Sequence, residues 1–380
     1  MNLNNLLNNK YEIKGKIFRD EILNYQSRYH SLMSLNQMEF IMSLISENKL
    51  NNVLEIGVFN GVSSLAILKA GLKNNNKFEL YSIDLGNNPN FFGKAAIELC
   101  TDEEKKHYHL FLGKTSSNIT ELIPSDVKFD LVFIDGKHSH PSPMFDLLYV
   151  IPYLNDENII VLHDIVDVVR FVPNDYGGSY LFESWSYNKY RVYDYDNKRF
   201  SYMGCIFMHK NLEEFKKNIL LLSNIPFESD PWMLNIYNDN TLDVGNYKNT
   251  NYGLGFDDEY INKIIKYVSQ YIHDKDFIEK FSSILNMNYN DYLNKWPMHI
   301  NKARNLYFLH SMAVHYLENT INNQLEDKLK LNDLENQLNR LVNSIAWWIP
   351  IRKWRDNFRN KILYEQNRTE QNRTEQNRTE

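Results

Sequence analysis

Five short, largely apolar runs recur between residues 53 and 164, and segments with helical spacing separate them. Such runs are typical of parallel strands buried on both faces of a sheet. The alternation predicts an α/β fold with a doubly wound, Rossmann-like sheet. Strands are expected at 53–57, 78–84, 108–112, 129–135 and 158–164, helices at 35–50 and 61–72, and an antiparallel strand pair at 191–193 and 203–208.

The pattern changes after about residue 210, because 11 of the 14 glycines precede that point and longer helical segments follow it. This predicts an α/β domain at 35–210, preceded by an N-terminal segment at 1–34 and followed by a helical accessory or dimerisation region at 211–320. Helices are expected at 211–223, 257–274, 275–286 and 299–320, with a loop rich in Asn and Asp at 238–252.

The C-terminal region has three patterns. Residues 321–345 carry leucines at heptad spacing, which predicts a short coiled-coil-like helix that either forms a homo-oligomer or packs on its own domain. Residues 346–364 combine an aromatic helical face with basic side chains, which favours contact with a membrane surface over packing on the protein itself. Residues 365–380 repeat the sequence EQNRT and are expected to be disordered.

Composition excludes several classes of protein. A formal net charge of -6 argues against general affinity for nucleic acid. Cys100 and Cys205 are too far apart in sequence for a CxxC metal pair, which fits a reducing compartment. The N-terminus lacks the pattern of a signal peptide, and no long apolar run suits a membrane span. We therefore expect a cytoplasmic protein that associates peripherally with the inner membrane through residues 346–364.

A candidate binding loop follows the first predicted strand. In Glu55-Ile56-Gly57-Val58-Phe59-Asn60-Gly61, the two glycines allow the backbone to come close to a ligand. Ser63, at the start of the next helix, offers a hydroxyl and N–H groups that suit a carboxylate. The third glycine of a dinucleotide-binding loop is missing, which makes a pyrophosphate site less favoured. A plain strand-to-helix turn is the alternative.

Asp84 adds a second element, because it ends the next strand, 27 residues after Gly57. A doubly wound sheet places this carboxylate beside the first loop, where it is able to accept two ribose hydroxyls. An aspartate that merely caps a helix or turn is the alternative.

These residues resemble a known family. Leu54 to Ser63 is similar to the first motif of class I S-adenosylmethionine (SAM) dependent methyltransferases, above all the subgroup with catechol O-methyltransferase. Ile134-Asp135-Gly136-Lys137-His138-Ser139-His140 resembles the IDGxHxY string of bacterial relatives that include macrocin O-methyltransferase and cephalosporin hydroxylase-like proteins. The resemblance covers residues 35–210 and implies a SAM-dependent O-methyltransferase. A SAM-binding, hydroxylase-like relative and a non-catalytic, membrane-docked assembly protein of the same fold are the alternatives.

The resemblance also implies roles for individual residues. The loop that begins at Glu55 would hold the methionine half of SAM, and Asp84 would bind the ribose. Asp135 would lie between the cofactor and the acceptor. The other implied contacts are Gly57, Asn60, Gly61 and Ser63 with the methionine half and Gly113, Thr115 and Ser116 with adenine.

A metal and a base are the remaining chemical expectations. Asp135 and Asp164 end neighbouring strands and could share one Mg²⁺. Metal-dependent relatives have a third ligand after the second aspartate, where this chain has Ile165, so His163, Asp167 or water would have to substitute. His138 is a candidate general base near neutral pH, with a structural imidazole as the alternative. His140 stands where relatives carry Tyr and is a weaker candidate.

The acceptor is expected to be a sugar hydroxyl of a bacterial surface glycan. Aromatic residues between Asp175 and Trp185 suit sugar rings if they line the mouth of the site, whereas packing of Tyr180, Phe182 and Trp185 in the core is the alternative. The C-terminal tail also resembles those of surface-polysaccharide enzymes from Campylobacter-like organisms.

Overall fold

The computed structural model describes residues 18–166, 176–185, 189–194, 199–209, 212–227, 258–293 and 308–314. The chain divides into two compact units, residues 1–301 and 302–380. All of the strands described below lie in the first unit. In the second unit, the described residues 308–314 are helical.

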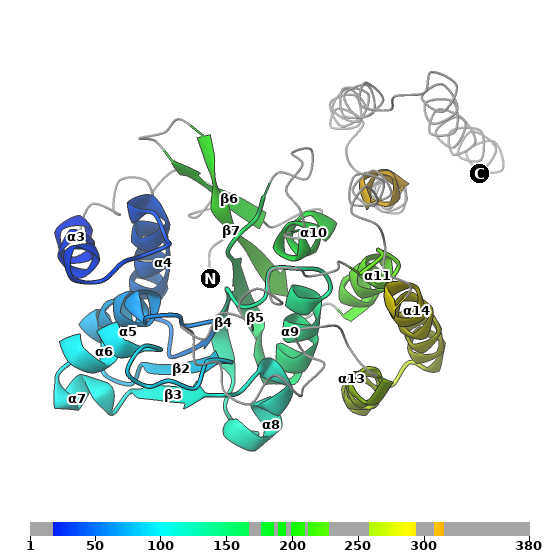
Figure 1. The fold of residues 1–380 in the computed structure, drawn as a ribbon, viewed down its shortest axis with the longest axis horizontal. Helices are drawn as coiled ribbons and strands as arrows, with labels where there is room; N and C mark the ends of the chain where they lie inside the picture. The colour runs from blue at the N-terminus through cyan, green and yellow to red at the C-terminus, as the bar shows by residue number, and fades with distance from the viewer. Residues whose placement is uncertain are drawn as a thin grey trace, which may run out of the picture. The chain divides into compact units, whose positions relative to one another are not determined.

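One mixed sheet forms the centre of the first unit (Figure 1). Its strand order is β3-β2-β1-β4-β5-β7-β6, with the first five strands parallel and β7 antiparallel to both of its neighbours. The strands are β1 (Asn52–Ile56), β2 (Glu79–Asp84), β3 (Tyr108–Leu112), β4 (Phe129–Ile134), β5 (Leu154–Leu162), β6 (Lys189–Asp194) and β7 (Arg199–His209). The predicted doubly wound fold and its antiparallel closing pair are confirmed.

Side chains of the central strands are buried on both faces of the sheet. On β4, Leu131 and Phe133 join a core cluster with helices α4 and α5, while the alternate residues Val132 and Ile134 point to the other face and are buried as well. Each such side chain contributes about 2 kcal/mol of hydrophobic free energy. Burial on both sides explains why these strands read as continuous apolar runs in the sequence.

Helices cover both faces of the sheet, as Figure 1 shows. The helices α4 (Leu35–Asn48) and α5 (Val62–Asn74) pack together on one face, and α9 (Ser142–Val150) and α10 (Gly177–Ser184) pack together on the other. Ser34 begins α4 with a capping box, in which its hydroxyl accepts the Gln37 N–H and its own N–H donates to the Gln37 side chain.

Shorter elements complete the connections between the strands. A further helix, α3, packs against α4 and α5, so residues 18–34 belong to the fold. The remaining elements of this part are α3 (Arg19–Arg28), α6 (Lys94–Leu99), α7 (Asp102–Lys105), η2 (Ser116–Asn118), α8 (Ile119–Leu122) and η3 (Ile151–Tyr153).

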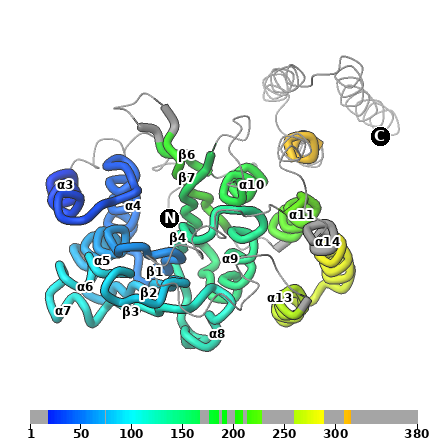
Figure 2. Tube along the Cα trace, viewed as in Figure 1, coloured from blue at the N-terminus to red at the C-terminus, as the bar shows by residue number. Residues whose placement is uncertain are grey.

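Three helices that follow the sheet pack beside α9 and α10 in the same compact unit (Figure 2). They are α11 (Leu212–Ser223), α13 (Asp258–Tyr271) and α14 (Lys275–Leu293). The Tyr267 hydroxyl on α13 donates to the backbone carbonyl of Tyr149 on α9 at 2.8 Å. The helices expected at 211–223, 257–274 and 275–286 are therefore present, and α14 runs seven residues further than predicted.

Several sequence predictions fall outside the described residues. These are the loop at 238–252, the coiled-coil-like helix at 321–345, the amphipathic helix at 346–364 and the EQNRT repeats at 365–380. None of the described helices is long and apolar enough to cross a membrane.

The topology fixes where a ligand can bind. From β1 the chain builds outward through β2 and β3, then returns to place β4 on the other side of β1. The loops after β1 and β4 therefore leave the sheet in opposite directions, which opens a crevice at the carboxyl ends of the strands.

Candidate functional site

A cavity of about 410 Å³ occupies this crevice, a volume suited to a small organic ligand. Residues from the loops after β1, β2, β3, β4 and β5 line it. Among the residues singled out from the sequence, the cavity wall includes Gly57, Asn60, Ser63, Asp84, Thr115, Ser116, Asp135, His138 and Asp164. Glu55, Gly61 and Gly113 lie outside this wall.

The two loop glycines are required by contacts within the protein. Gly57 has φ +92°, and a Cβ there would lie 2.1 Å from the backbone oxygen of Asp135. Gly61 has φ +83°, and a Cβ there would lie 2.6 Å from Cα of Gly93, ahead of α6. Both conformations disfavour any side chain. We expected the glycines to make room for a ligand, whereas the structure shows them making room for neighbouring backbone.

Asp84 clamps the loop after β1. Its Oδ2 accepts the backbone N–H groups of Val58 at 2.7 Å and Phe59 at 3.0 Å, and its Oδ1 accepts that of Gly86 at 2.6 Å. Burial raises the pKa of Asp84, and these three hydrogen bonds oppose the shift. A carboxylate has roughly four acceptor positions, so about one remains for a ligand hydroxyl. Asp84 therefore has an acceptor position left for about one ribose hydroxyl, whereas we expected it to accept two.

Glu55 lies beneath the loop and is fully buried. Its carboxylate accepts the hydroxyls of Ser63 at 2.6 Å, Ser64 at 2.5 Å and Ser82 at 2.7 Å. Burial raises the pKa of Glu55 to about 7, although the three serine hydroxyls oppose that shift. In this position Glu55 shapes the loop from behind, joining β1 to β2 and the start of α5.

The N-terminal segment supplies a wall of the cavity that the sequence did not indicate. Ser31, Leu32 and Met33, in the connection between α3 and α4, line the cavity. The Asn60 side chain donates to the backbone carbonyl of His30 and so ties the binding loop to this connection. No motif or periodicity marks these residues in the sequence.

A second wall lies beyond β3. Thr115 and Ser116 both line the cavity, as expected from the sequence. The Thr115 backbone N–H donates to the Asn118 side chain at 3.2 Å, which fixes the turn of η2. The Ser116 hydroxyl donates to Asp146 on α9 at 2.6 Å. Asp146, a further residue of the cavity wall, was not singled out from the sequence.

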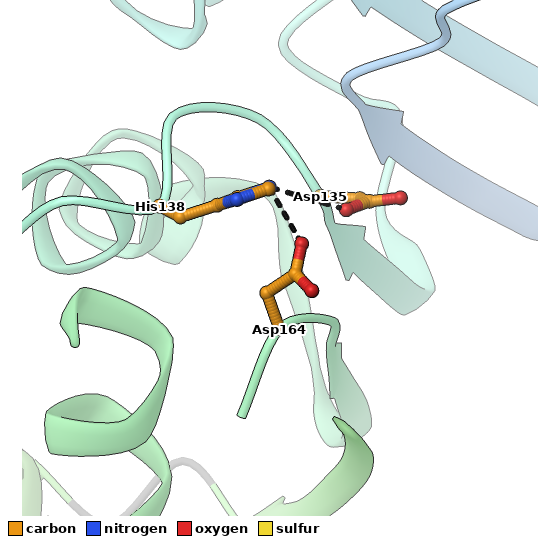
Figure 3. A group of neighbouring side chains, drawn as sticks. All are labelled: Asp135, His138 and Asp164. Atoms are coloured by element: carbon orange, nitrogen blue, oxygen red, sulfur yellow. Dashed lines mark ion pairs between the residues drawn. The ribbon is translucent and has the colours of Figure 1, made fainter. Parts of the chain in front are cut away.

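Asp135, His138 and Asp164 converge on one point of the cavity wall (Figure 3). Asp135 follows β4, Asp164 follows β5, and His138 reaches back from the loop after β4. The His138 Nε2 atom lies 3.0 Å from Asp164 Oδ2 and 3.5 Å from Asp135 Oδ1. Asp164 has φ +53°, a conformation uncommon for residues other than glycine.

His163 supports this cluster from below. Its Nδ1 lies 3.1 Å from Asp135 Oδ1 and 3.2 Å from Asp164 Oδ2, and the residue is buried. Burial by itself would raise the pKa of Asp135, but the charges and hydrogen bonds of His163 and His138 outweigh it and bring that pKa to about 2. Asp135 is therefore held as a carboxylate.

The cluster fits a divalent cation. One ligand atom from each of Asp135, His138 and Asp164 lies within 4.8 Å of the other two. Octahedral coordination at about 2.1 Å places neighbouring ligand atoms about 3 Å apart, close to the separations found around His138. Ile165 is buried and apolar, so it would not be a ligand, and His138 would be the third ligand instead. Asp167 lies outside the described residues.

Two other sequence expectations have different outcomes. His140 is buried, donates from Nε2 to the Ile225 carbonyl at 3.2 Å, and packs between Tyr180 and Phe227, so its role is structural. Tyr180, Phe182 and Trp185 are also buried, which confirms the alternative of core packing. The other interpretation, in which these side chains face a sugar at the mouth of the site, is wrong, because Tyr180, for example, packs against His140 and Tyr176 instead.

The fold and this site define a class I methyltransferase domain, with a crevice over β1 and β4 and an acidic residue, Asp84, at the end of β2. Residues 54–165 match the family model described as a methyltransferase domain. This part of the chain is thus a methyltransferase domain. No curated protein matches the sequence.

Solved structures with a similar fold include three O-methyltransferases. A protein from Klebsiella pneumoniae described as an O-methyltransferase shares 15% identity, with a TM-score of 0.40, over 52% of this chain and 96% of its own. TomG from Streptomyces achromogenes, solved with SAM, shares 16% identity, with a TM-score of 0.39, over 50% of this chain and 88% of its own. An O-methyltransferase from Bacillus cereus, solved with SAH, shares 15% identity, with a TM-score of 0.37, over 50% and 90%.

Proposed function

We propose that this protein methylates a sugar hydroxyl during the biosynthesis of a bacterial surface glycan, such as a capsule or lipooligosaccharide. The observation that carries the proposal is one cavity whose wall includes both the loop held by Asp84 and the cluster of Asp135, His138 and Asp164. The first feature suits an adenine nucleoside, and the second suits a hydroxyl that must lose a proton.

The loop after β1 would hold the methionine end of SAM. Ser63 lines the cavity at the start of α5, where N–H groups of the first turn point outward. Gly61 precedes α5 and has no side chain to cap these groups. They therefore suit the carboxylate of the methionine group. When bound, SAM supplies a methyl group on a sulfonium sulfur.

The cluster would act on the acceptor. His138 is the candidate general base, because it lies in the cavity wall, 3.0 Å from Asp164 Oδ2 and 3.5 Å from Asp135 Oδ1. Asp135 and Asp164 would orient His138 and stabilise the charge that it gains. Positioning of the hydroxyl in line with the methyl group would supply much of the rate enhancement.

We propose Mg²⁺ as the cation of this site, with Asp135, Asp164 and His138 as the residues that would hold it. Two carboxylates suit a hard cation, whereas an imidazole nitrogen also suits Mn²⁺ or Zn²⁺. When bound, the cation would lower the pKa of a coordinated hydroxyl. His138 would act either as a ligand of this cation or as the general base. The metal content of the purified protein would distinguish these two roles.

Apolar side chains at the mouth of the cavity support an acceptor with a carbohydrate ring. Phe59 is 38% exposed and Leu32 is 69% exposed, and both line the cavity. Phe59 also packs edge-on against Phe91, which fixes its ring. An exposed aromatic face suits the C–H face of a sugar. Phe59 is therefore the candidate for this contact, in place of Tyr180, Phe182 and Trp185, which are buried.

The test uses the full chain with labelled SAM and a polysaccharide extract from a strain that lacks the gene. Transfer of label to the polysaccharide is expected, together with loss of one CH₂ unit of mass from the glycan of the deletion strain. SAM binding without methyl transfer would favour a hydroxylase-like reaction. Absence of SAM binding would favour a non-catalytic assembly protein and refute the proposal.

Residues 346–364 lie outside the described residues, and we propose that they bring the enzyme to the inner membrane surface, near a lipid-linked acceptor. Their basic side chains would attract anionic headgroups. The protein is then expected to partition between cytoplasm and membrane, and deletion of residues 345–380 should move it to the soluble fraction. Wild-type protein that is already wholly soluble would refute membrane contact.

A further inference from the structure

The backbone around Asp164 has a conformation that its own sequence does not favour. Asp164 follows β5 and has φ +53°, which costs free energy for any residue that carries a side chain. Such a conformation persists only where the surrounding structure determines it. The contacts of residues 163–166 with other elements therefore decide where the Asp164 carboxylate lies.

Ile165 anchors this segment to β7. Its side chain is fully buried, and its Cδ1 atom lies over Gly204 on β7, where an added Cβ would be only 2.9 Å from it. The Ile165 N–H donates to the backbone carbonyl of Tyr202, also on β7, at 2.9 Å. The residue after Asp164 is therefore held both by its side chain and by its backbone.

Arg191 on β6 binds the carbonyl of the same residue. Its Nη2 donates to the Ile165 carbonyl at 2.7 Å, and its Nε donates to the Ser201 carbonyl on β7 at 3.2 Å. One guanidinium therefore joins β6, β7 and the segment after β5. Hydrogen bonds from a charged donor are stronger than those between neutral groups, so the loss of Arg191 would release the Ile165 carbonyl from its firmest contact.

Helix α10 packs against the segment from another side. An added Cβ at Gly178 would lie 2.9 Å from the carbonyl oxygen of His163 and 3.6 Å from that of Asp164, so the backbone of α10 comes directly against this turn. The Ser179 hydroxyl donates to the Val166 carbonyl at 2.7 Å. Contacts from β6, β7 and α10 thus act together to maintain the positive φ of Asp164.

We infer that Arg191 is a positioning residue, which holds the backbone after β5 so that the Asp164 carboxylate stays 3.0 Å from His138 and serves the acceptor or its cation. This inference rests on the proposed function, because that function gives Asp164 its task. Without the guanidinium, the backbone of Asp164 would relax and carry its carboxylate away from His138. The strand pairing of Arg191 with Gly204 involves the backbone, so a substitution at position 191 removes the contact to Ile165 and keeps the sheet.

The test measures Mn²⁺ affinity by electron paramagnetic resonance and S-adenosylhomocysteine affinity by titration calorimetry on the full-length protein. Arg191→Met should weaken Mn²⁺ binding about 10-fold, as the loss of a group that orients a ligand does. Arg191→Lys keeps a charged donor and should recover part of this loss. Lys128→Met removes a similar bond, to the Pro152 carbonyl at the amino end of β4, and should keep the wild-type affinity. S-adenosylhomocysteine should bind all four proteins equally, because the loop held by Asp84 is unchanged.

A double-mutant cycle distinguishes positioning from a general loss of stability. In a protein that already carries Asp164→Ala, Arg191→Met should cause no further loss of Mn²⁺ affinity, because Arg191 acts through Asp164. A second loss of the same size in that background would overturn the inference.

The conformation of Asp164 is measured directly by its ¹³Cα and ¹³Cβ chemical shifts in protein labelled at aspartate, with Asp164→Ala to assign the signal. These shifts should change in Arg191→Met and stay as in wild type in Lys128→Met. Unchanged shifts in a folded Arg191→Met protein, verified by thermal melting, would overturn the role of Arg191. If that variant does not fold, Arg191→Gln takes its place in the same comparison. If wild type binds neither Mn²⁺ nor S-adenosylhomocysteine, the proposed function fails, whereas the shifts still decide whether Arg191 positions Asp164.

Discussion

Glu55 allows a quantitative test of how the binding loop is built. The pKa of this buried carboxyl is raised from 4.5 to about 7, chiefly by burial. A carboxyl whose pKa is higher in the folded state stabilises the protein fully below its unfolded pKa, and that contribution is lost as the pH rises through the folded pKa. At about 1.4 kcal/mol per pH unit, the free energy of unfolding should fall by about 3 kcal/mol between pH 4.5 and pH 7.5 because of Glu55.

Glu55→Gln removes this titration. Urea denaturation at several values between pH 4.5 and pH 7.5 should show that the variant loses about 3 kcal/mol less stability than wild type over this range. Any constant effect of the amide on the bonds from Ser63, Ser64 and Ser82 cancels in this comparison. Glu103→Gln, at a side chain that is 82% exposed, should follow the wild-type profile. Parallel profiles for wild type and Glu55→Gln would refute the buried environment assigned to Glu55.

Three further predictions concern the site. His138→Ala should keep SAM binding but lose about 10²-fold or more in turnover, as expected of a general base, and unchanged turnover with the true acceptor would remove His138 from the mechanism. Gly57→Ala should destabilise the protein far more than Gly113→Ala in thermal melts, since both have positive φ but only the Cβ at position 57 meets backbone, at 2.1 Å; equal losses would contradict that contact. Asp164→Ala should weaken Mn²⁺ binding at least 10-fold in electron paramagnetic resonance titrations, and wild-type affinity would exclude Asp164 as a ligand.

The sequence was sufficient to predict the ends of β4 and β5 and the residues that follow them. Apolar runs that end in Asp135 and Asp164 identify buried parallel strands, and parallel strands bring their carboxyl ends to one edge of the sheet. The convergence of these two aspartates followed from this rule, whereas the place of His138 beside them did not, because His138 lies in the loop after β4. The antiparallel pair β6 and β7 was predictable for a similar reason, because each carries strand-like residues beside a short connection.

Other features depend on tertiary contacts that leave no local pattern. The lining role of Ser31 and Met33 arises because α3 folds back on α4 and α5, and nothing in the spacing of these residues indicates it. The sequence favoured core packing of Tyr180 but did not decide it, since an aromatic side chain suits both a surface and a core position. Asp146 is separated by 30 residues from the hydroxyl that orients it, so only the folded chain reveals the pair.

The hydrogen bond from the Asn60 side chain to the carbonyl of His30 joins the matched methyltransferase domain to a segment that lies before it in the sequence. The matched methyltransferase domain spans residues 54–165, yet one side of the ligand chamber comes from residues 31–33. A shortened protein that started at Leu35 would keep the motifs described above. It would lack the part of the cavity wall that Ser31, Leu32 and Met33 form. Removal of the residues before Leu35 should therefore weaken nucleoside binding, and it should also destabilise the fold, because Phe18, Ile22, Tyr25 and Met33 belong to the core.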